Sequence, residues 1–130
     1  MERSATSAPH SDSNDAAHTL VRHFSMEVRE AYTRFTSNRD PAEADTVVVA
    51  VVLDHMPDKK RRPLDAPPDH CRLVADLGFD SIAITEMVFF LEDLFHVRIS
   101  NDEILRVQTV GDLRAFVRQK LAAVDEATKA

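Results

Sequence analysis

The most informative stretch of this chain is Asp76-Leu77-Gly78-Phe79-Asp80-Ser81-Ile82. Gly78 can adopt backbone angles that a residue with a Cβ avoids, so it suits a sharp turn into a helix. Asp80 is a good N-cap, because its carboxylate can accept hydrogen bonds from free amides of the first turn. Ser81 then falls at the first helical position, with its hydroxyl near solvent. A helix N-terminus carries partial positive charge and unpaired N–H groups, so this serine can hold a phosphodiester with little added strain.

The stretch resembles the attachment site of acyl and peptidyl carrier proteins, where the serine of a Leu-Gly-x-Asp-Ser frame receives 4′-phosphopantetheine from coenzyme A. The resemblance reaches back loosely to Asp40 and forward to about Leu121, through Phe95, Ile99, Asp102-Glu103 and Thr109-Val110. It implies an all-α, four-helix carrier-protein bundle of three longer helices and one short helix. It also implies that Ser81 bears the cofactor covalently, with Asp80 beside it. The competing interpretation is that Ser81 is an ordinary first-turn residue.

Four segments are expected. Residues 1–15 are too poor in apolar side chains to order themselves and are expected to be a disordered tail. Residues 16–36 are predicted to form an extra amphipathic helix, because apolar residues recur there at helical spacing: Leu20, Val21, Phe24, Val28, Ala31 and Phe35. We expect this helix to pack on the core; the alternative is a docking helix for a partner or a second copy. Residues 40–122 are the predicted bundle, and 123–130 a polar C-terminal tail.

Two signals conflict at the start of the bundle. The run Thr46-Val47-Val48-Val49-Ala50-Val51-Val52-Leu53 is rich in β-branched residues and by propensity alone favours a strand. It is preceded by Asp40-Pro41-Ala42-Glu43, which has an N-cap, a proline at the first helical position and a glutamate three residues after the cap. The resemblance also places a helix here. We therefore predict a helix over 40–56.

The region 57–72 is predicted to be a long loop, because Pro57, Pro63, Pro67 and Pro68 preclude a continuous helix. Its basic run, Lys59-Lys60-Arg61-Arg62, is interpreted as a solvated loop rather than a ligand site. Cys71 is the single cysteine and excludes an internal disulfide. We expect it to be a small, partly buried residue rather than a catalytic thiol.

The helix that follows Ser81 presents two faces. A buried stripe is expected from Ile84, Met87, Val88, Leu91 and Phe95, flanked by Phe90 and Leu94. A second face combines apolar and acidic residues, namely Ile82, Glu86, Phe89 and Asp93. We predict that this face, together with Glu92, binds partners, with Phe89 as an anchor and the acids attracting a basic surface. The alternative is that Phe89 packs on a loop. Ala83 stands where the family often carries an acid.

Two further helix starts follow. Ser100-Asn101-Asp102-Glu103 is a capping box that opens a short helix to about Arg106. Thr109-Val110-Gly111-Asp112 is another N-terminal signal. The last helix places its apolar residues on one face, namely Val110, Leu113, Phe116, Val117 and Leu121.

The composition and charge of the chain argue against several classes of partner and location. The formal net charge of −6 disfavours nucleic acid as a partner and favours proteins with basic surfaces. The first twenty residues lack an apolar stretch, and the apolar run 47–53 is too short to span a bilayer. We therefore expect a cytoplasmic monomer without membrane insertion. The six histidines show no helical metal spacing with a carboxylate partner, so no metal site is expected.

The favoured function is a non-enzymatic carrier that shuttles thioester-linked acyl groups in a fatty acid, polyketide or specialised lipid pathway. Its expected partners are a phosphopantetheinyl transferase and acyl-loading ligases, synthases or acyltransferases with basic docking surfaces. An aminoacyl or peptidyl carrier and an unmodified interaction module of the same fold remain open. A hydrolase with Ser81 as nucleophile is disfavoured, because Gly78-Phe79-Asp80-Ser81-Ile82 lacks the second glycine of a nucleophile elbow.

Overall fold

The computed structural model describes residues 18–58 and 67–129, with side chains up to residue 126. Its named helices are α2 (Met26–Asn38), α3 (Pro41–His55), α4 (Ser81–Phe95), α5 (Asn101–Ile104) and α6 (Val110–Lys129). Within these ranges the β-pairing is limited to one isolated bridge between Arg72 and Thr109. The predicted all-α fold is confirmed, with three longer bundle helices, one short helix and an additional N-terminal helix. No helix in the described ranges is both long and apolar enough to cross a bilayer.

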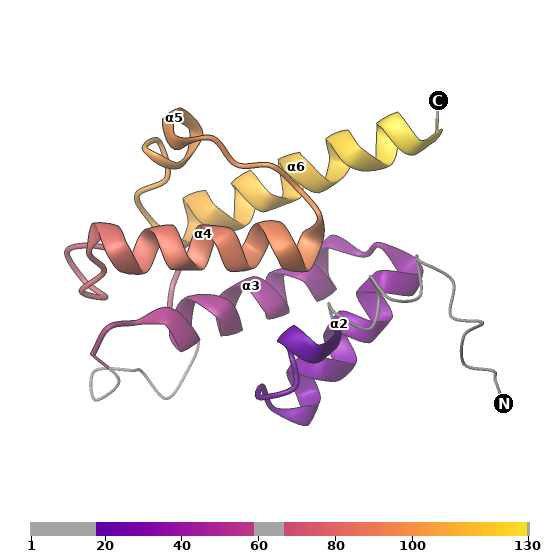
Figure 1. The fold of residues 1–130 in the computed structure, drawn as a ribbon, viewed down its shortest axis with the longest axis horizontal. Helices are drawn as coiled ribbons and strands as arrows, with labels where there is room; N and C mark the ends of the chain where they lie inside the picture. Colours follow the sequence, from indigo (N-terminus) through magenta and orange to yellow (C-terminus); the bar gives the residue numbers. More distant parts are fainter. Residues whose placement is uncertain (1–17, 59–66, 130) are drawn as a thin grey trace, which may run out of the picture.

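Helix α3 lies at the centre and contacts α2 on one side and α4 and α6 on the other (Figure 1). The predicted N-cap forms, because the Asp40 carboxylate accepts a hydrogen bond from Ala42 N at 2.9 Å. Val47, Val48, Val51 and Val52 are all completely buried. A helix that is covered on several sides can be apolar nearly all round. This burial outweighs the strand propensity of the valines, and the predicted helix over 40–56 is confirmed.

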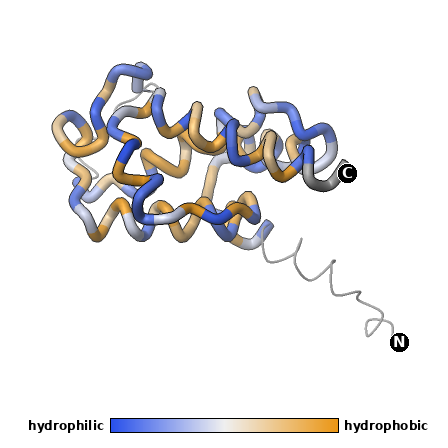
Figure 2. Tube along the Cα trace, turned by 90° about the horizontal axis from the view of Figure 1, so that it is seen from above, coloured by the Kyte–Doolittle hydropathy of each residue, from blue (hydrophilic) through white to orange (hydrophobic). Residues whose placement is uncertain are grey.

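Both hydrophobic and hydrophilic residues occur along the helical turns of the trace, as the hydropathy colouring shows (Figure 2). In α4 the core-facing residues are Ala83, Met87, Val88, Leu91, Leu94 and Phe95. Ile84 and Phe90 are partly buried against the same core. The predicted buried stripe of α4 is therefore confirmed.

The N-terminal region differs from the single helix predicted over 16–36. Residues 18–20 are helical, residues 21–24 form a turn, and a new helix begins at Met26. Ser25 caps that helix, since its hydroxyl accepts a hydrogen bond from Val28 N at 3.3 Å. The turn is held by His23, which lies 3.0 Å from the Asp54 carboxylate of α3. Apolar spacing could not distinguish the turn from a helix, because residues on both sides of it pack on one core.

Helix α2 is part of that core. Ala31, Tyr32 and Phe35 are buried. The Tyr32 hydroxyl donates a hydrogen bond to the Leu94 carbonyl at 2.9 Å, which satisfies an acceptor near the end of α4. Burial raises the pKa of this hydroxyl above its usual value. Phe35 meets the Phe95 ring edge-on at 5.5 Å between centroids. The structure confirms that this helix packs on the core.

The polar tail predicted over 123–130 is helical as far as Lys129, where α6 ends. The reason lies partly in sequence, since alanine, glutamate and lysine favour helix. It also lies in tertiary structure, because Asp125 pairs with Arg39 at 2.8 Å. Arg39 is the left-handed C-cap of α2, so this ion pair ties the end of α2 to the end of α6. Residues 1–17 and the basic run 59–62 lie outside the described residues.

Candidate functional site

The loop before Ser81 is anchored in the core and places this residue at the start of α4. Leu73, Leu77 and Phe79 are buried, with Leu77 the most exposed of them at 5%. Leu73 N donates to the Gln108 carbonyl at 2.9 Å, and Phe79 N donates to the Leu73 carbonyl at 2.9 Å. Gly78 has a φ of 76°, the left-handed region that a residue with a Cβ rarely adopts. The turn glycine predicted from sequence is therefore confirmed.

Ser81 is the first residue of α4, and it is exposed. Asp80 is the N-cap, and its carboxylate accepts a hydrogen bond from Ala83 N at 2.8 Å. The amides of Ser81 and Ile82 have no acceptor in the described part of the chain, as is usual in a first turn. The Ser81 hydroxyl likewise has no partner there. A nucleophilic oxygen and two free N–H groups thus meet at the positive end of a helix dipole, which is suited to a phosphate.

A pocket of about 550 Å³ opens beside Ser81. Its walls come from the loop at 72–75, the first turns of α4, and α5 with the connector after it: Arg72, Leu73, Val74, Ala75, Ser81, Ile84, Thr85, Asn101, Ile104, Leu105, Val107 and Gln108. Thr85 is fixed there because its hydroxyl donates to the Ser81 carbonyl at 2.8 Å. The pocket lining is mostly apolar with a few polar residues, and it can shelter a chain attached at Ser81.

Residues 61–117 match a family model described as "Phosphopantetheine attachment site". An acyl carrier protein of Phenylobacterium zucineum is 36% identical over 77 residues, which are 56% of this chain and 87% of that protein. The chain belongs to the acyl carrier protein family. The covalent cofactor implied by this family is 4′-phosphopantetheine.

Other acyl carrier proteins match over shorter segments. The protein from an Exiguobacterium species is 44% identical over 46 residues, 35% of this chain and 58% of its own length. The protein from Thermotoga maritima is 30% identical over 53 residues, 41% of this chain and 65% of its own length. The chain thus spans less than two thirds of several of the acyl carrier proteins it matches. No solved structure matches this chain.

The residues around Ser81 fit the cofactor of the acyl carrier protein family. Ser81 would hold it through its exposed hydroxyl, and the free amides of Ser81 and Ile82 would face its phosphate. Asp80 contributes indirectly, because it fixes the first turn through Ala83 N. The pocket lined by Thr85 and Ile84 offers room for the rest of the arm. Once bound, the cofactor supplies a terminal thiol that forms thioesters.

The predicted partner face is largely exposed. The exposed fraction is 69% for Ile82 and 60% for Phe89, and Glu86 and Asp93 are exposed as well. Beside Ile82 lies a hollow of about 310 Å³ between the end of α3 and the start of α4, which Asp80 and Glu86 also line. Phe89 does not pack into the core, unlike its neighbour Phe90. We call Ile82, Glu86, Phe89 and Asp93 the docking face.

Glu92 differs from these residues. It is partly buried, and its carboxylate accepts a hydrogen bond from Ile99 N at 2.7 Å. It therefore fastens the connector between α4 and α5. Ala83, the position at which the family often carries an acid, is 8% exposed and faces the core.

Arg72 is a site residue that the sequence interpretation missed. It lines the same pocket as Ser81 although several residues separate them along the chain. No local signal marks it, because only the folded loop brings its side chain to this pocket.

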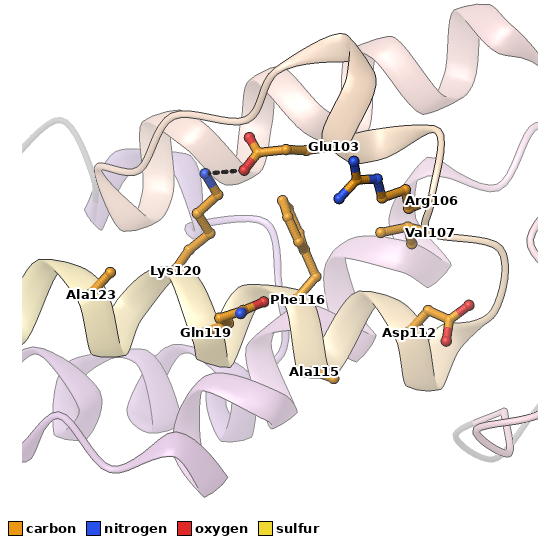
Figure 3. Close-up of a pocket in the computed structure, with 9 residues that line it drawn as sticks. All are labelled: Glu103, Arg106, Val107, Asp112, Ala115, Phe116, Gln119, Lys120 and Ala123. Carbon is orange, nitrogen blue, oxygen red and sulfur yellow. Dashed lines mark ion pairs between the residues drawn. The ribbon is translucent and has the colours of Figure 1, made fainter.

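A second pocket of about 540 Å³ lies between α5 and α6, and Figure 3 shows its side chains. The Phe116 ring stands between the Glu103–Lys120 pair and Arg106. Glu103 accepts from Ser100 N at 2.9 Å in the predicted capping box. It also pairs with Lys120 Nζ at 2.7 Å. The hydrogen bonds from Lys120 and from the Ser100 backbone lower the pKa of Glu103 from 4.5 to about 2.

This pKa predicts an acid-dependent loss of stability. Because the folded-state pKa of Glu103 is depressed, its contribution is present above pH 4.5 and disappears as the pH falls towards about 2. Glu103→Gln removes the ion pair with Lys120, so the variant should melt at a lower temperature than the native protein at neutral pH. The gap between the two thermal midpoints should close as the pH falls from 4.5 to 2.

Thermal melts monitored by circular dichroism across this range test the prediction. Asp102→Asn is the control, since it removes a neighbouring exposed carboxylate that has no ion pair among the residues described. A gap between native protein and Glu103→Gln that stays constant with pH would contradict the assignment.

Proposed function

We propose that the chain bears a 4′-phosphopantetheine arm on Ser81 and carries acyl groups on that arm between enzymes. The observation that supports this most directly is the exposed Ser81 hydroxyl at the start of α4, which, like the amides of Ser81 and Ile82, has no hydrogen-bond partner among the described residues. The protein performs no catalysis of its own. Its residues position the hydroxyl, receive the phosphate and present the cargo. The cargo is an intermediate of a fatty acid, polyketide or specialised lipid pathway.

In the loading reaction Ser81 Oγ forms a bond to the phosphorus atom of coenzyme A that is next to the pantetheine group. The bond from that phosphorus to the nucleotide part breaks, and 3′,5′-ADP leaves. The serine proton passes to a base of the transferase. Buried side chains and backbone hydrogen bonds anchor the loop before Ser81, which reduces the cost of ordering this residue in the transferase active site.

The loading test is the intact mass of the chain after incubation with coenzyme A, Mg²⁺ and a broad-specificity phosphopantetheinyl transferase. We expect the native chain to gain one phosphopantetheine and Ser81→Ala to gain none. Ser100→Ala is the matched control, because Ser100 also starts a helix but its hydroxyl already accepts from Glu103 N at 3.2 Å. It should load as the native chain does. An unmodified native chain, under conditions that load a known carrier, would instead support an unmodified interaction module.

We further propose that the docking face binds the transferase and the acyl-transferring enzymes through their basic surfaces. Phe89 provides an exposed aromatic anchor, and Glu86 and Asp93 flank it with negative charge. Carboxylates around such an anchor increase the association rate with a basic partner and leave the complex easily dissociated. A carrier that visits several enzymes needs this weak binding.

Phe89→Ala is expected to lower the kcat/KM for phosphopantetheinylation about tenfold, since an aromatic anchor in an interface contributes more than about 1 kcal/mol. The initial rate of mass gain at low carrier concentration measures this. Met26→Ala is the control, because Met26 is 64% exposed but lies at the start of α2, away from the docking face and from the Ser81 pocket. Equal rates for native protein and Phe89→Ala would exclude Phe89 from the transferase interface.

A further inference from the structure

The pocket beside Ser81 has an unusual charge for this chain. Its lining contains one charged residue, Arg72, and none of the carboxylates in the described ranges. The whole chain carries 22 acidic and 16 basic residues. The lining of this pocket therefore carries one positive charge on a protein of net charge −6, and the Asp76 carboxylate lies outside the lining, next to the Arg72 backbone. Arg72 has no ion pair in the part of the chain that the structure describes, so its guanidinium is available.

The backbone of Arg72 is held firmly at the rim. Its N–H donates to the Asp76 carboxylate at 2.8 Å. Its carbonyl accepts from Asp76 N and Leu77 N, both at 3.0 Å. The residue also forms the bridge with Thr109. A guanidinium on a fixed backbone loses less conformational freedom when it pairs with an anion, and it can bind an oxyanion with two parallel hydrogen bonds.

Two further polar residues of the lining suit the same chemistry. Asn101 and Gln108 line the pocket with side-chain amides that can donate hydrogen bonds. The lining also includes apolar residues, of which Leu73 is 1% exposed. A ligand that suits this lining has an apolar stem and an anionic group that reaches the rim.

We propose that Arg72 makes this pocket an anion site for the group carried on Ser81. The anion is either the phosphodiester of the arm or a carboxylate at the end of an acyl cargo. Both present negatively charged oxygens to the same guanidinium. This inference rests on the proposed attachment at Ser81 and adds to it the charge class of what the pocket holds.

The experiment compares the native chain, Arg72→Gln and Arg106→Gln in three loaded forms. The forms carry the bare arm, a neutral butyryl group, or a succinyl group that ends in a carboxylate. Intact mass first verifies loading of each sample. Arg106→Gln is the matched control, because Arg106 lines the other pocket rather than this one. The readouts are the thermal midpoint of each loaded form relative to its own apo form, and the NMR signal of the Arg72 Nε–Hε group.

We expect loading to raise the thermal midpoint of the native chain and of Arg106→Gln by about 1–4 °C more than that of Arg72→Gln. The same difference in all three forms assigns the anion to the phosphodiester. A difference confined to the succinyl form assigns it to the cargo carboxylate. Either result, with a shifted Arg72 Nε–Hε signal, supports the proposal. Equal midpoint changes in the native chain and Arg72→Gln, with an unmoved Arg72 Nε–Hε signal in verified loaded samples, would overturn this inference and leave the attachment at Ser81 standing. A native chain that gains no mass would overturn both this inference and the attachment at Ser81.

Discussion

Phe35→Ala is expected to lower the free energy of unfolding by about 3–5 kcal/mol, the usual cost of replacing a buried phenylalanine with alanine. Phe35 is 2% exposed. Its ring meets the Phe95 ring at the end of α4, and the Arg39 guanidinium lies 4.6 Å from the Phe35 ring centroid. The variant would leave a cavity between α2 and the end of α4. An effect this large would show that the N-terminal helix is an integral part of the carrier fold.

Urea unfolding followed by circular dichroism measures this change. Phe89→Ala provides the matched control, since it removes the same side chain from a position that is 60% exposed. That control should alter the free energy of unfolding by about 0.5 kcal/mol or less. If Phe35→Ala were as stable as Phe89→Ala, α2 would not contribute to the core in solution.

Asp45→Ala should lower the free energy of unfolding by about 2–3 kcal/mol. Asp45 is the one buried charged residue in the described part of the chain, at 6% exposure. Its carboxylate accepts hydrogen bonds from Arg114 at 3.2 Å and from Arg118, both on α6. Removing one partner of a buried ion pair costs about 3–5 kcal/mol. We expect less here because the side chains of Arg114 and Arg118 are 32% and 51% exposed and can be hydrated.

The control for Asp45→Ala is Glu43→Ala, two residues earlier on α3. Glu43 pairs with Arg34 at 2.8 Å, but the Arg34 side chain is 52% exposed, and such surface pairs contribute about 0.2–1 kcal/mol. Urea denaturation of both variants at neutral pH measures the two changes in the free energy of unfolding. The prediction fails if the two substitutions have equal effects, because burial of Asp45 would then have no energetic consequence.

Much of the candidate site could be predicted because its signals are local. Asp80 caps α4 through an amide three residues away, and Ser100 forms its capping box with Glu103. Thr109 and Asp112 exchange hydrogen bonds at the start of α6 in the same way. Such contacts depend on backbone geometry within one turn, so residue type and spacing are sufficient to identify them.

Other features could not be predicted, because distant residues compete for the same groups. Glu43 has the spacing of a capping box with Asp40, yet its carboxylate binds Arg34 of α2 instead. The apolar spacing over 16–36 continues across a turn that His23 and Ser25 fix. Arg72 reaches the Ser81 pocket only through the folded loop.

The sequence by itself determined that a helix capped by Asp80 starts at Ser81 and exposes that serine's hydroxyl, and that a short capped helix and a longer one follow it. These are interactions between near neighbours, which any compact fold of the chain would retain. Only the tertiary structure decided that the valines of α3 are helical, that α2 closes the far end of α4, and that Asp45 lies beneath the arginines of α6. The physical reason is that burial and charge pairing between distant residues depend on how helices pack: Asp45 and Arg118 are 73 positions apart, and Arg39 and Asp125 are 86 apart.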